Sequence, residues 1–230
     1  MKRVVLACVV SLLATSAFAE LSKDEVKRLN ESGAVLTELR NAPDNGIPAD
    51  LWQKAACVIV MPGLKKGAFI VGGEYGSGVM SCRKAADWSA PVFMKLAKGS
   101  VGFQIGGEET DLVLLIMNDR GAEKLFQDKV SLGADVSVAA GPVGRTGAAA
   151  TDAQLHAEML AYSRSRGVFA GIDLSGGSLH PDKDADARAY GKEVNARDIV
   201  MGTARVTMPQ PAVAFVNSLK KDTRATTGQK

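Results

Sequence analysis

The fold of this chain is decided by residues 55–80, which read AACVIVMPGLKKGAFIVGGEYGSGVM. Short apolar runs alternate here with glycine-containing or polar breaks, a pattern that is typical of β-strands connected by turns. Pro62-Gly63 is expected to stop the first strand, and Lys65-Lys66 to sit in a tight turn before the next strand at residues 68–75. Glycine inside a strand marks a bulge, a bend or a close backbone approach. The segment therefore predicts a strongly curved sheet.

The same pattern continues toward the C-terminus as far as residue 174. Further strands are predicted at residues 79–83, 92–97, 101–105, 112–117, 134–139, 156–163 and 168–174, with one helix at 119–128. A weak echo links GAFIVGGE at 67–74, GFQIGGE at 102–108 and GVFAGID at 167–173. The echo has no fixed period, so it does not indicate a solenoid.

Helices flank the strand region on both sides. Ser22-Lys-Asp-Glu25 is a capping box, and an apolar stripe follows it at helical spacing as far as Leu39. Additional helices are predicted at residues 48–54, 184–192, 195–200 and 211–220. The predicted class is α+β: a β-rich, strongly curved antiparallel sheet or small barrel-like sandwich, packed with N- and C-terminal helices. One domain over residues 20–220 and a flexible tail over 221–230 are expected.

Residues 1–19 have the features of a signal peptide. Lys2 and Arg3 precede an apolar run over residues 4–13, and Ala17-Phe-Ala19 offers small residues for cleavage. A run of about 10 residues is too short to span a bilayer, which needs roughly 20. We therefore expect export to the periplasm, with outer-membrane association as a further expectation. A lipoprotein anchor at Cys8 is disfavoured because too little apolar sequence precedes it.

The charge and composition of the sequence exclude some classes of partner and of protein. Without residues 1–19 the chain has 26 basic and 25 acidic residues, so no broad nucleic-acid footprint is present. A hydrophobic content of 46% and a charged content of 23% are ordinary for a globular protein, and exclude a disordered chain.

Motifs for catalysis or cofactor binding are weak. Ser77 in YGSG lacks the first glycine of a nucleophile elbow, and GPVGRTG at 141–147 lacks the lysine of a phosphate loop. His156 and His180 are the only histidines, too few for a zinc cluster. A non-enzymatic protein without a cofactor is predicted.

One acidic run matches the spacing of an EF-hand calcium loop. Asp182, Asp184, Asp186 and Glu193 occupy its positions 1, 3, 5 and 12, but Ala187 stands where the loop needs glycine. The neighbouring alanines favour a helix, whose N-terminus attracts aspartates. We therefore predict no metal site.

Cys57 and Cys82 are the cysteines that remain after residues 1–19. An exported protein meets an oxidising compartment, and a bridge between them would contribute on the order of 3 kcal/mol. Alternatively, Cys57 is a small buried residue of an apolar strand. The sequence leaves both interpretations open.

Basic residues near glycine-rich, apolar strands suggest a site for an anionic amphiphile. The candidate lipid-binding residues are Lys65, Lys66, Arg145, Tyr162, Arg164 and Arg166. Tyr162, Arg164 and Arg166 would share one strand face, and guanidinium groups bind phosphate in a bidentate way. The acyl chain would contact Phe69, Phe93, Phe103 or Phe169. The alternative is that these residues are ordinary solvated charges.

Motifs along most of the chain resemble the SYLF domain family of lipid-binding proteins. The matching stretches are VMPGLKKGAFIVGGEYGSGVM (60–80), WSAPVFMKL (88–96), GSVGFQIGGE (99–108), DLVLLIMN (111–118), GPVGR (141–145), YSRSRGVFAGIDLSGG (162–177), YGKEV (190–194) and ARDIV (196–200). They follow one another in the expected order between residues 32 and 202.

The resemblance implies a non-enzymatic lipid-binding domain. Eukaryotic members of the family join it to SH3 or FYVE modules, bind phosphoinositides and act in actin-linked endocytosis. This sequence shows neither module and carries an export signal, so it looks like the bacterial secreted form, for which an anionic phospholipid of the cell envelope is the expected ligand. The alternative is a structural or interaction protein that binds an envelope protein without lipid.

Overall fold

The computed structural model describes residues 21–40, 46–68, 71–85, 87–101, 108–144, 151–165 and 168–224. The strands are β1 (Cys57–Ala68), β2 (Val71–Lys84), β3 (Asp87–Trp88), β4 (Val92–Val101), β5 (Glu108–Ile116), β6 (Val130–Ser131), β7 (Val138–Ala140), β8 (Met159–Ser165), β9 (Val168–Gly171) and β10 (Gly177–Pro181). The helices are α1 (Lys23–Arg40), α2 (Ala49–Lys54), α3 (Asp119–Lys124), α4 (Asp152–His156), α5 (Lys183–Tyr190), α6 (Ala196–Met201) and α7 (Gln210–Arg224). Residues 1–19, predicted as a signal peptide, lie outside the described residues.

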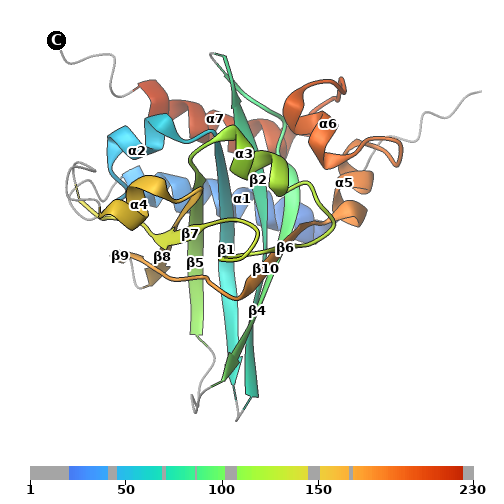
Figure 1. The fold of residues 1–230 in the computed structure, drawn as a ribbon. Helices are drawn as coiled ribbons and strands as arrows, with labels where there is room; N and C mark the ends of the chain where they lie inside the picture. The colour runs from blue at the N-terminus through green and yellow to red at the C-terminus, as the bar shows by residue number, and fades with distance from the viewer. Residues whose placement is uncertain are drawn as a thin grey trace, which may run out of the picture.

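The strands form one curved sheet in the order β6-β10-β4-β2-β1-β5-β8-β7, with β3 added to β2 and β9 to β8 (Figure 1). The α+β class is confirmed. Neighbouring strands are antiparallel except for β7 and β8, which pair in parallel. The sheet is therefore mixed rather than wholly antiparallel.

Both faces of the sheet are covered over part of its length. Alternate residues of β1 separate the two cores: Val58 and Val60 pack with α1 and α7, whereas Ile59 and Met61 face α3, α6 and the chain around β10. We call the first side the α1 face. Strands β1, β2, β4 and β5 extend beyond the helices (Figure 1). We call the end of these strands that holds the paired residues 66–68, 72–74 and 98–100 the projecting end.

The predicted turn at Lys65-Lys66 is wrong, because β1 passes through it without a break. Its pairing with β2 and β5 shifts register between Val60 and Lys65, which identifies a β-bulge at Pro62-Gly63. Gly63 has φ +59°, a conformation that glycine adopts at little cost. Lys65 therefore lies on a strand, with neighbouring strands on both sides.

The break predicted between residues 75 and 79 is also wrong, since β2 is continuous from Val71 to Lys84. Gly78 allows the bulged strand to approach: a Cβ there would overlap the carbonyl of Val60 and the side chain of Met61. Gly76 and Gly78 thus accommodate the bulged strand β1 instead of ending a strand.

Smaller differences occur elsewhere. Helix α4 and strand β10 were not predicted, β9 ends at Gly171 rather than 174, and α7 continues past Lys220 to Arg224, into the segment predicted as a tail. No helix in the described ranges combines the length and apolarity needed to cross a membrane.

Cys57 and Cys82 are direct partners in the β1–β2 ladder, and a disulfide joins them. Of the two interpretations that the sequence leaves open, the bridge is the one the structure contains. It fixes the end of β1–β2 opposite to the projecting end.

Arg83 and Lys84 are consecutive basic residues at the end of β2, and their side chains lie on opposite faces of the sheet. Arg83 donates from Nε to the carbonyl of Ala55 (3.2 Å) and from a terminal nitrogen to that of Trp52 (3.0 Å), at the C-terminus of α2. Lys84 points to the other face and lies against Gly202, the left-handed C-cap of α6. Burial lowers the pKa of both side chains. Each cation meets the negative end of a helix dipole.

Candidate functional site

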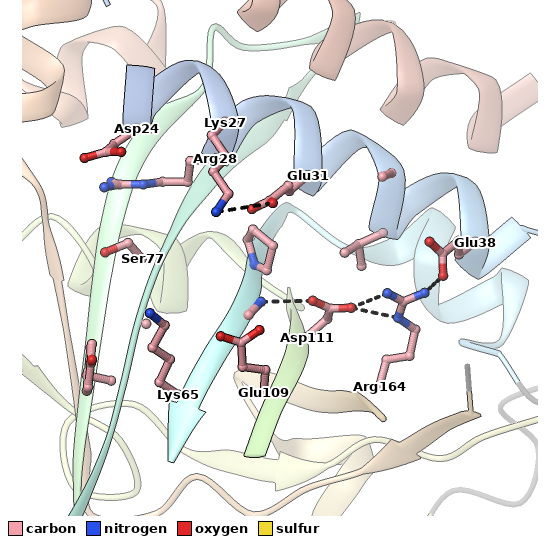
Figure 2. A pocket seen from close by; sticks show the side chains of 16 residues that line it. Asp24, Lys27, Arg28, Glu31, Glu38, Lys65, Ser77, Glu109, Asp111 and Arg164 are labelled. Atoms are coloured by element: carbon pink, nitrogen blue, oxygen red, sulfur yellow. Dashed lines mark hydrogen bonds and ion pairs between the residues drawn. The ribbon is translucent and has the colours of Figure 1, made fainter. Parts of the chain in front are cut away.

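A cleft of about 560 Å³ lies between α1 and the α1 face of the sheet, next to the projecting end (Figure 2). Its lining residues are Asp24, Lys27, Arg28, Glu31, Ala34, Val35, Glu38, Pro62, Gly63, Lys65, Tyr75, Gly76, Ser77, Glu109, Asp111 and Arg164. Five of these are acidic and four are basic. The cleft is therefore highly charged but close to neutral as a whole.

Helix α1 forms one wall of the cleft. Its start is the predicted capping box: the Ser22 amide donates to Glu25 (2.6 Å) and the Glu25 amide donates to Ser22 Oγ (3.4 Å). Leu29 and Leu36 are buried on the sheet. This docking leaves the charged side chains that line the cleft, from Asp24 to Glu38, at the edge of the helix.

The floor of the cleft is set by strand register. Lys65 of β1 is directly opposite Tyr75 of β2 and Glu109 of β5, while Asp111 of β5 is opposite Arg164 of β8. Residues opposite one another in antiparallel strands project on the same side of the sheet. All five residues consequently face α1.

Arg164, a predicted head-group ligand, is already engaged by two carboxylates. Its Nε donates to Asp111 Oδ2 (2.8 Å), a terminal nitrogen contacts the same oxygen, and the other terminal nitrogen pairs with Glu38 of α1 (Figure 2). The second oxygen of Asp111 accepts from the Gly63 amide of the bulge (2.9 Å). Burial lowers the pKa of Arg164 and raises that of Asp111. The charge of Arg164 is thus internally neutralised.

Tyr162 shares a face with Arg164, as predicted, but its side chain is fully buried. It packs in the core beneath the helices, and burial raises its pKa strongly. In this structure the phenol has no surface to offer to a ligand.

Lys65 is exposed, and it forms no ion pair within the described ranges. The side chain of Lys66 and all of Arg145 and Arg166 lie outside the described residues, so their assignment stays a prediction. Among the predicted acyl-chain contacts, Phe93 is buried in the core under Arg28, whose guanidinium carbon lies 5.5 Å from the ring centre. The side chains of Phe69, Phe103 and Phe169 are outside the described part.

The acidic run at residues 182–186 lies at the start of α5, where Asp182 contacts α1 and Asp186 contacts β4. Asp182 caps α5 and pairs with Arg28 (3.1 Å) and Lys95 (2.9 Å). Asp186 accepts from the Phe93 amide (2.8 Å), and burial raises its pKa to about 7. The described residues contain no group of three or more acidic, histidine or cysteine side chains placed to hold a metal ion.

Sequence reasoning missed most of the cleft. The i, i+3 and i+4 spacing of Asp24, Lys27, Arg28 and Glu31 was a usable signal for one charged helix face. Glu109 and Asp111 were missed because their positions opposite Lys65 and Arg164 follow from the pairing of distant strands, which no local pattern shows. The polar side chains that line the cleft carry carboxylate, ammonium, guanidinium and hydroxyl groups.

Comparison with known proteins gives one consistent result. Residues 97–222 match the family model "Ysc84: Las17-binding protein actin regulator". The rat protein "SH3 domain-containing YSC84-like protein 1" is 36% identical over 196 residues, covering 84% of this chain and 56% of that protein. "LAS seventeen-binding protein 3" of Saccharomyces cerevisiae (strain ATCC 204508 / S288c) is 38% identical over 175 residues, covering 74% of this chain and 37% of that protein. "Protein YSC84" of the same strain is 34% identical over 182 residues, covering 77% and 38%. The chain thus spans between about a third and just over half of these relatives.

Proposed function

Because this chain belongs to the Ysc84 family, the family of SYLF domains, we propose that it is a non-enzymatic binding protein whose ligand is an anionic membrane lipid. The proposal includes a location: the chain is exported and acts in a bacterial cell envelope, in the periplasm or at the outer membrane. The apolar segment at residues 4–13 and the Cys57–Cys82 disulfide support this location, since disulfides persist in oxidising compartments.

The observation that carries the lipid proposal is the pair formed by Lys65 and Tyr75. The two residues are direct partners across β1 and β2 at the mouth of the cleft. Tyr75 is 60% exposed, one of few large hydrophobic residues that the described surface exposes. An ammonium beside an amphipathic aromatic side chain suits a membrane interface, where one end of the ring is apolar and the other is wet.

In this mechanism Lys65 donates to a lipid phosphate and Tyr75 covers the apolar part of the same molecule. A basic residue near an anionic surface contributes about 1 kcal/mol, so a single lysine gives weak binding that falls with salt. Arg164 would contribute only if Glu38 left its guanidinium. We therefore assign the phosphate contact to Lys65 rather than to Arg164.

The test is co-flotation of the chain, residues 20–230, with vesicles of phosphatidylcholine that contain increasing amounts of phosphatidylglycerol. We expect flotation at low salt that decreases as salt is raised. The double variant Lys65→Ala/Tyr75→Ser should lose most of it while its thermal unfolding stays that of the wild type, because both side chains are exposed.

A matched control removes one exposed lysine and one exposed apolar side chain elsewhere. Lys192→Ala/Met201→Ser does this near α6, away from the cleft. It should float like the wild type. Equal loss in both double variants would attribute flotation to general charge, and no flotation on any vesicle would overturn the lipid proposal.

The second candidate is a protein partner. Its support is the name of one relative, "LAS seventeen-binding protein 3", which describes binding to another protein. A stable protein partner in crosslinking pull-downs, together with failure to float, would favour this function over lipid binding.

A further inference from the structure

We propose that the cleft selects a lipid head group that carries a primary amine as well as a phosphate. This inference rests on the proposed lipid-binding function: it keeps the contact of Lys65 with a lipid phosphate and replaces a purely anionic head group by one that also carries a positive charge. It starts from the near-neutral charge of the cleft, which has no excess of cations to attract a purely anionic group.

The charged side chains that line the cleft fall into two groups: those that form an ion pair and those that form none within the described ranges. Arg164 is held by Asp111 and Glu38, and Arg28 by Asp182. Lys27 and Glu31 pair at 3.8 Å, with both side chains largely in solvent. Within the described ranges this leaves three exposed lining charges without an ion-pair partner: one cation, Lys65, and two carboxylates, Asp24 and Glu109.

The unpaired cation and one unpaired carboxylate stand next to each other. Lys65 and Glu109 are direct partners in the β1–β5 ladder, so their Cβ atoms are about 5 Å apart. In phosphoethanolamine two carbon atoms separate the phosphate oxygen from the ammonium. A head group of this length can place its phosphate on Lys65 and its ammonium on Glu109 at the same time.

A primary ammonium fits Glu109 better than a quaternary one. It supplies three N–H donors, whereas a choline nitrogen has none. Hydrogen bonds between charged groups are stronger than neutral ones, although solvent screens them at an exposed site. The exposed carboxylate therefore distinguishes ethanolamine from choline, and glycerol offers it no charge at all.

Ser77 supports placing the phosphate at this end of the cleft. Its side chain is half-buried on the α1 face and faces the same space as Lys65 (Figure 2). Its hydroxyl forms no hydrogen bond within the described part of the chain, and a hydroxyl can donate to a phosphate oxygen. At the other end of the cleft, Glu38 already occupies the guanidinium of Arg164.

The experiment compares three vesicle compositions at equal surface area: phosphatidylcholine alone, phosphatidylcholine with phosphatidylethanolamine, and phosphatidylcholine with phosphatidylglycerol. We expect binding of the wild type to be about fivefold tighter with phosphatidylethanolamine than with phosphatidylcholine alone, which corresponds to about 1 kcal/mol. Glu109→Gln should lose this preference but keep its binding to phosphatidylglycerol. Lys65→Ala should weaken binding to all three compositions.

Glu193→Gln is the control, since it removes an exposed carboxylate away from the cleft and should retain the preference. A soluble probe, glycerophosphoethanolamine, separates head-group recognition from bilayer effects. It should shift the NMR signals of Lys65 and Glu109 more than glycerol phosphate does.

The outcomes separate the two proposals. If the wild type floats equally on phosphatidylethanolamine and phosphatidylcholine, or Glu109→Gln retains the preference, the amine subsite is wrong while lipid binding stands. A preference for phosphatidylglycerol over phosphatidylethanolamine likewise overturns the amine subsite and supports a purely anionic ligand. If no vesicle binds, the lipid function itself fails.

Discussion

At the scale of single residues, Gly141 shows how closely the core is packed. A Cβ at this position would overlap the buried ring of Tyr162. We expect Gly141→Ala to lower the free energy of unfolding by about 2 kcal/mol, because the ring or the loop must move to make room. Urea denaturation followed by circular dichroism measures the loss.

Gly99→Ala is the matched control for this prediction. Gly99 lies on β4 at the projecting end, where an added Cβ would meet no atom within 4 Å. Its change in unfolding free energy should stay within about 0.5 kcal/mol, as for most surface substitutions. Similar losses in both variants would mean that the ring of Tyr162 is not the cause.

At the scale of elements, Asp186 joins α5 to β4 beneath α1. Burial raises its pKa to about 7, with the neighbouring Asp182 and Glu25 acting in the same direction and Arg28 against it. Between pH 4 and 7 the folded protein holds a proton here that the unfolded chain releases. This group therefore makes folding more favourable as the pH falls from about 7 toward 4.

The variant Asp186→Asn isolates this effect, because its amide oxygen can still accept from the Phe93 amide. We expect the difference in unfolding free energy between variant and wild type to change with pH between 5 and 7.5, with the wild type gaining on the variant as the pH falls. Urea unfolding at several pH values measures this difference. Titration of the two histidines affects the variant and the wild type equally, so it does not contribute to the difference. A difference that stays constant with pH would contradict the raised pKa.

The ion pairs of Glu25 and Asp182, near Asp186, change the stability with pH in the opposite direction: they stabilise the fold less as the pH falls. Burial alone would raise the pKa of both carboxylates. Hydrogen bonds outweigh it: Arg188 donates to Glu25 and lowers its pKa, and Lys95 and Arg28 donate to Asp182 and lower its pKa. Their stabilisation is present at neutral pH and is lost as the pH falls through those lowered values. The contact of α1 with α5 should therefore weaken in acid below about pH 4.

At the scale of the whole molecule, the Cys57–Cys82 bridge makes stability depend on redox conditions. It closes a separation of 25 residues, for which the chain-entropy estimate is about 3 kcal/mol. Cys57→Ala/Cys82→Ala should lower the unfolding free energy by about that amount in urea titrations. The wild type in a reducing buffer should match the double variant, and an unchanged midpoint on reduction would contradict the prediction.

The sequence predicted the parts of the fold that depend on local chemistry. The capping box at Ser22, the apolar run at the start of β1 and the candidate cysteine pair are examples. Continuity of β1 and β2 could not be predicted, because Gly63 and Gly78 look like turn residues until the strands are placed side by side. For the same reason Arg164 was predicted to bind a ligand, whereas its partners Asp111 and Glu38 come from distant segments.

Arg83 and Lys84 carry a consequence for how the sheet assembles. Successive residues of a strand point to opposite faces, so slipping β2 by one position would exchange the two side chains. The guanidinium of Arg83 would then lie at the end of α6, and the ammonium of Lys84 would lie at the end of α2. An ammonium cannot repeat the forked contact that the guanidinium makes with the carbonyls of Trp52 and Ala55. The contacts of these two adjacent residues with the helix ends thus favour the observed register of β2 once α2 and α6 have docked.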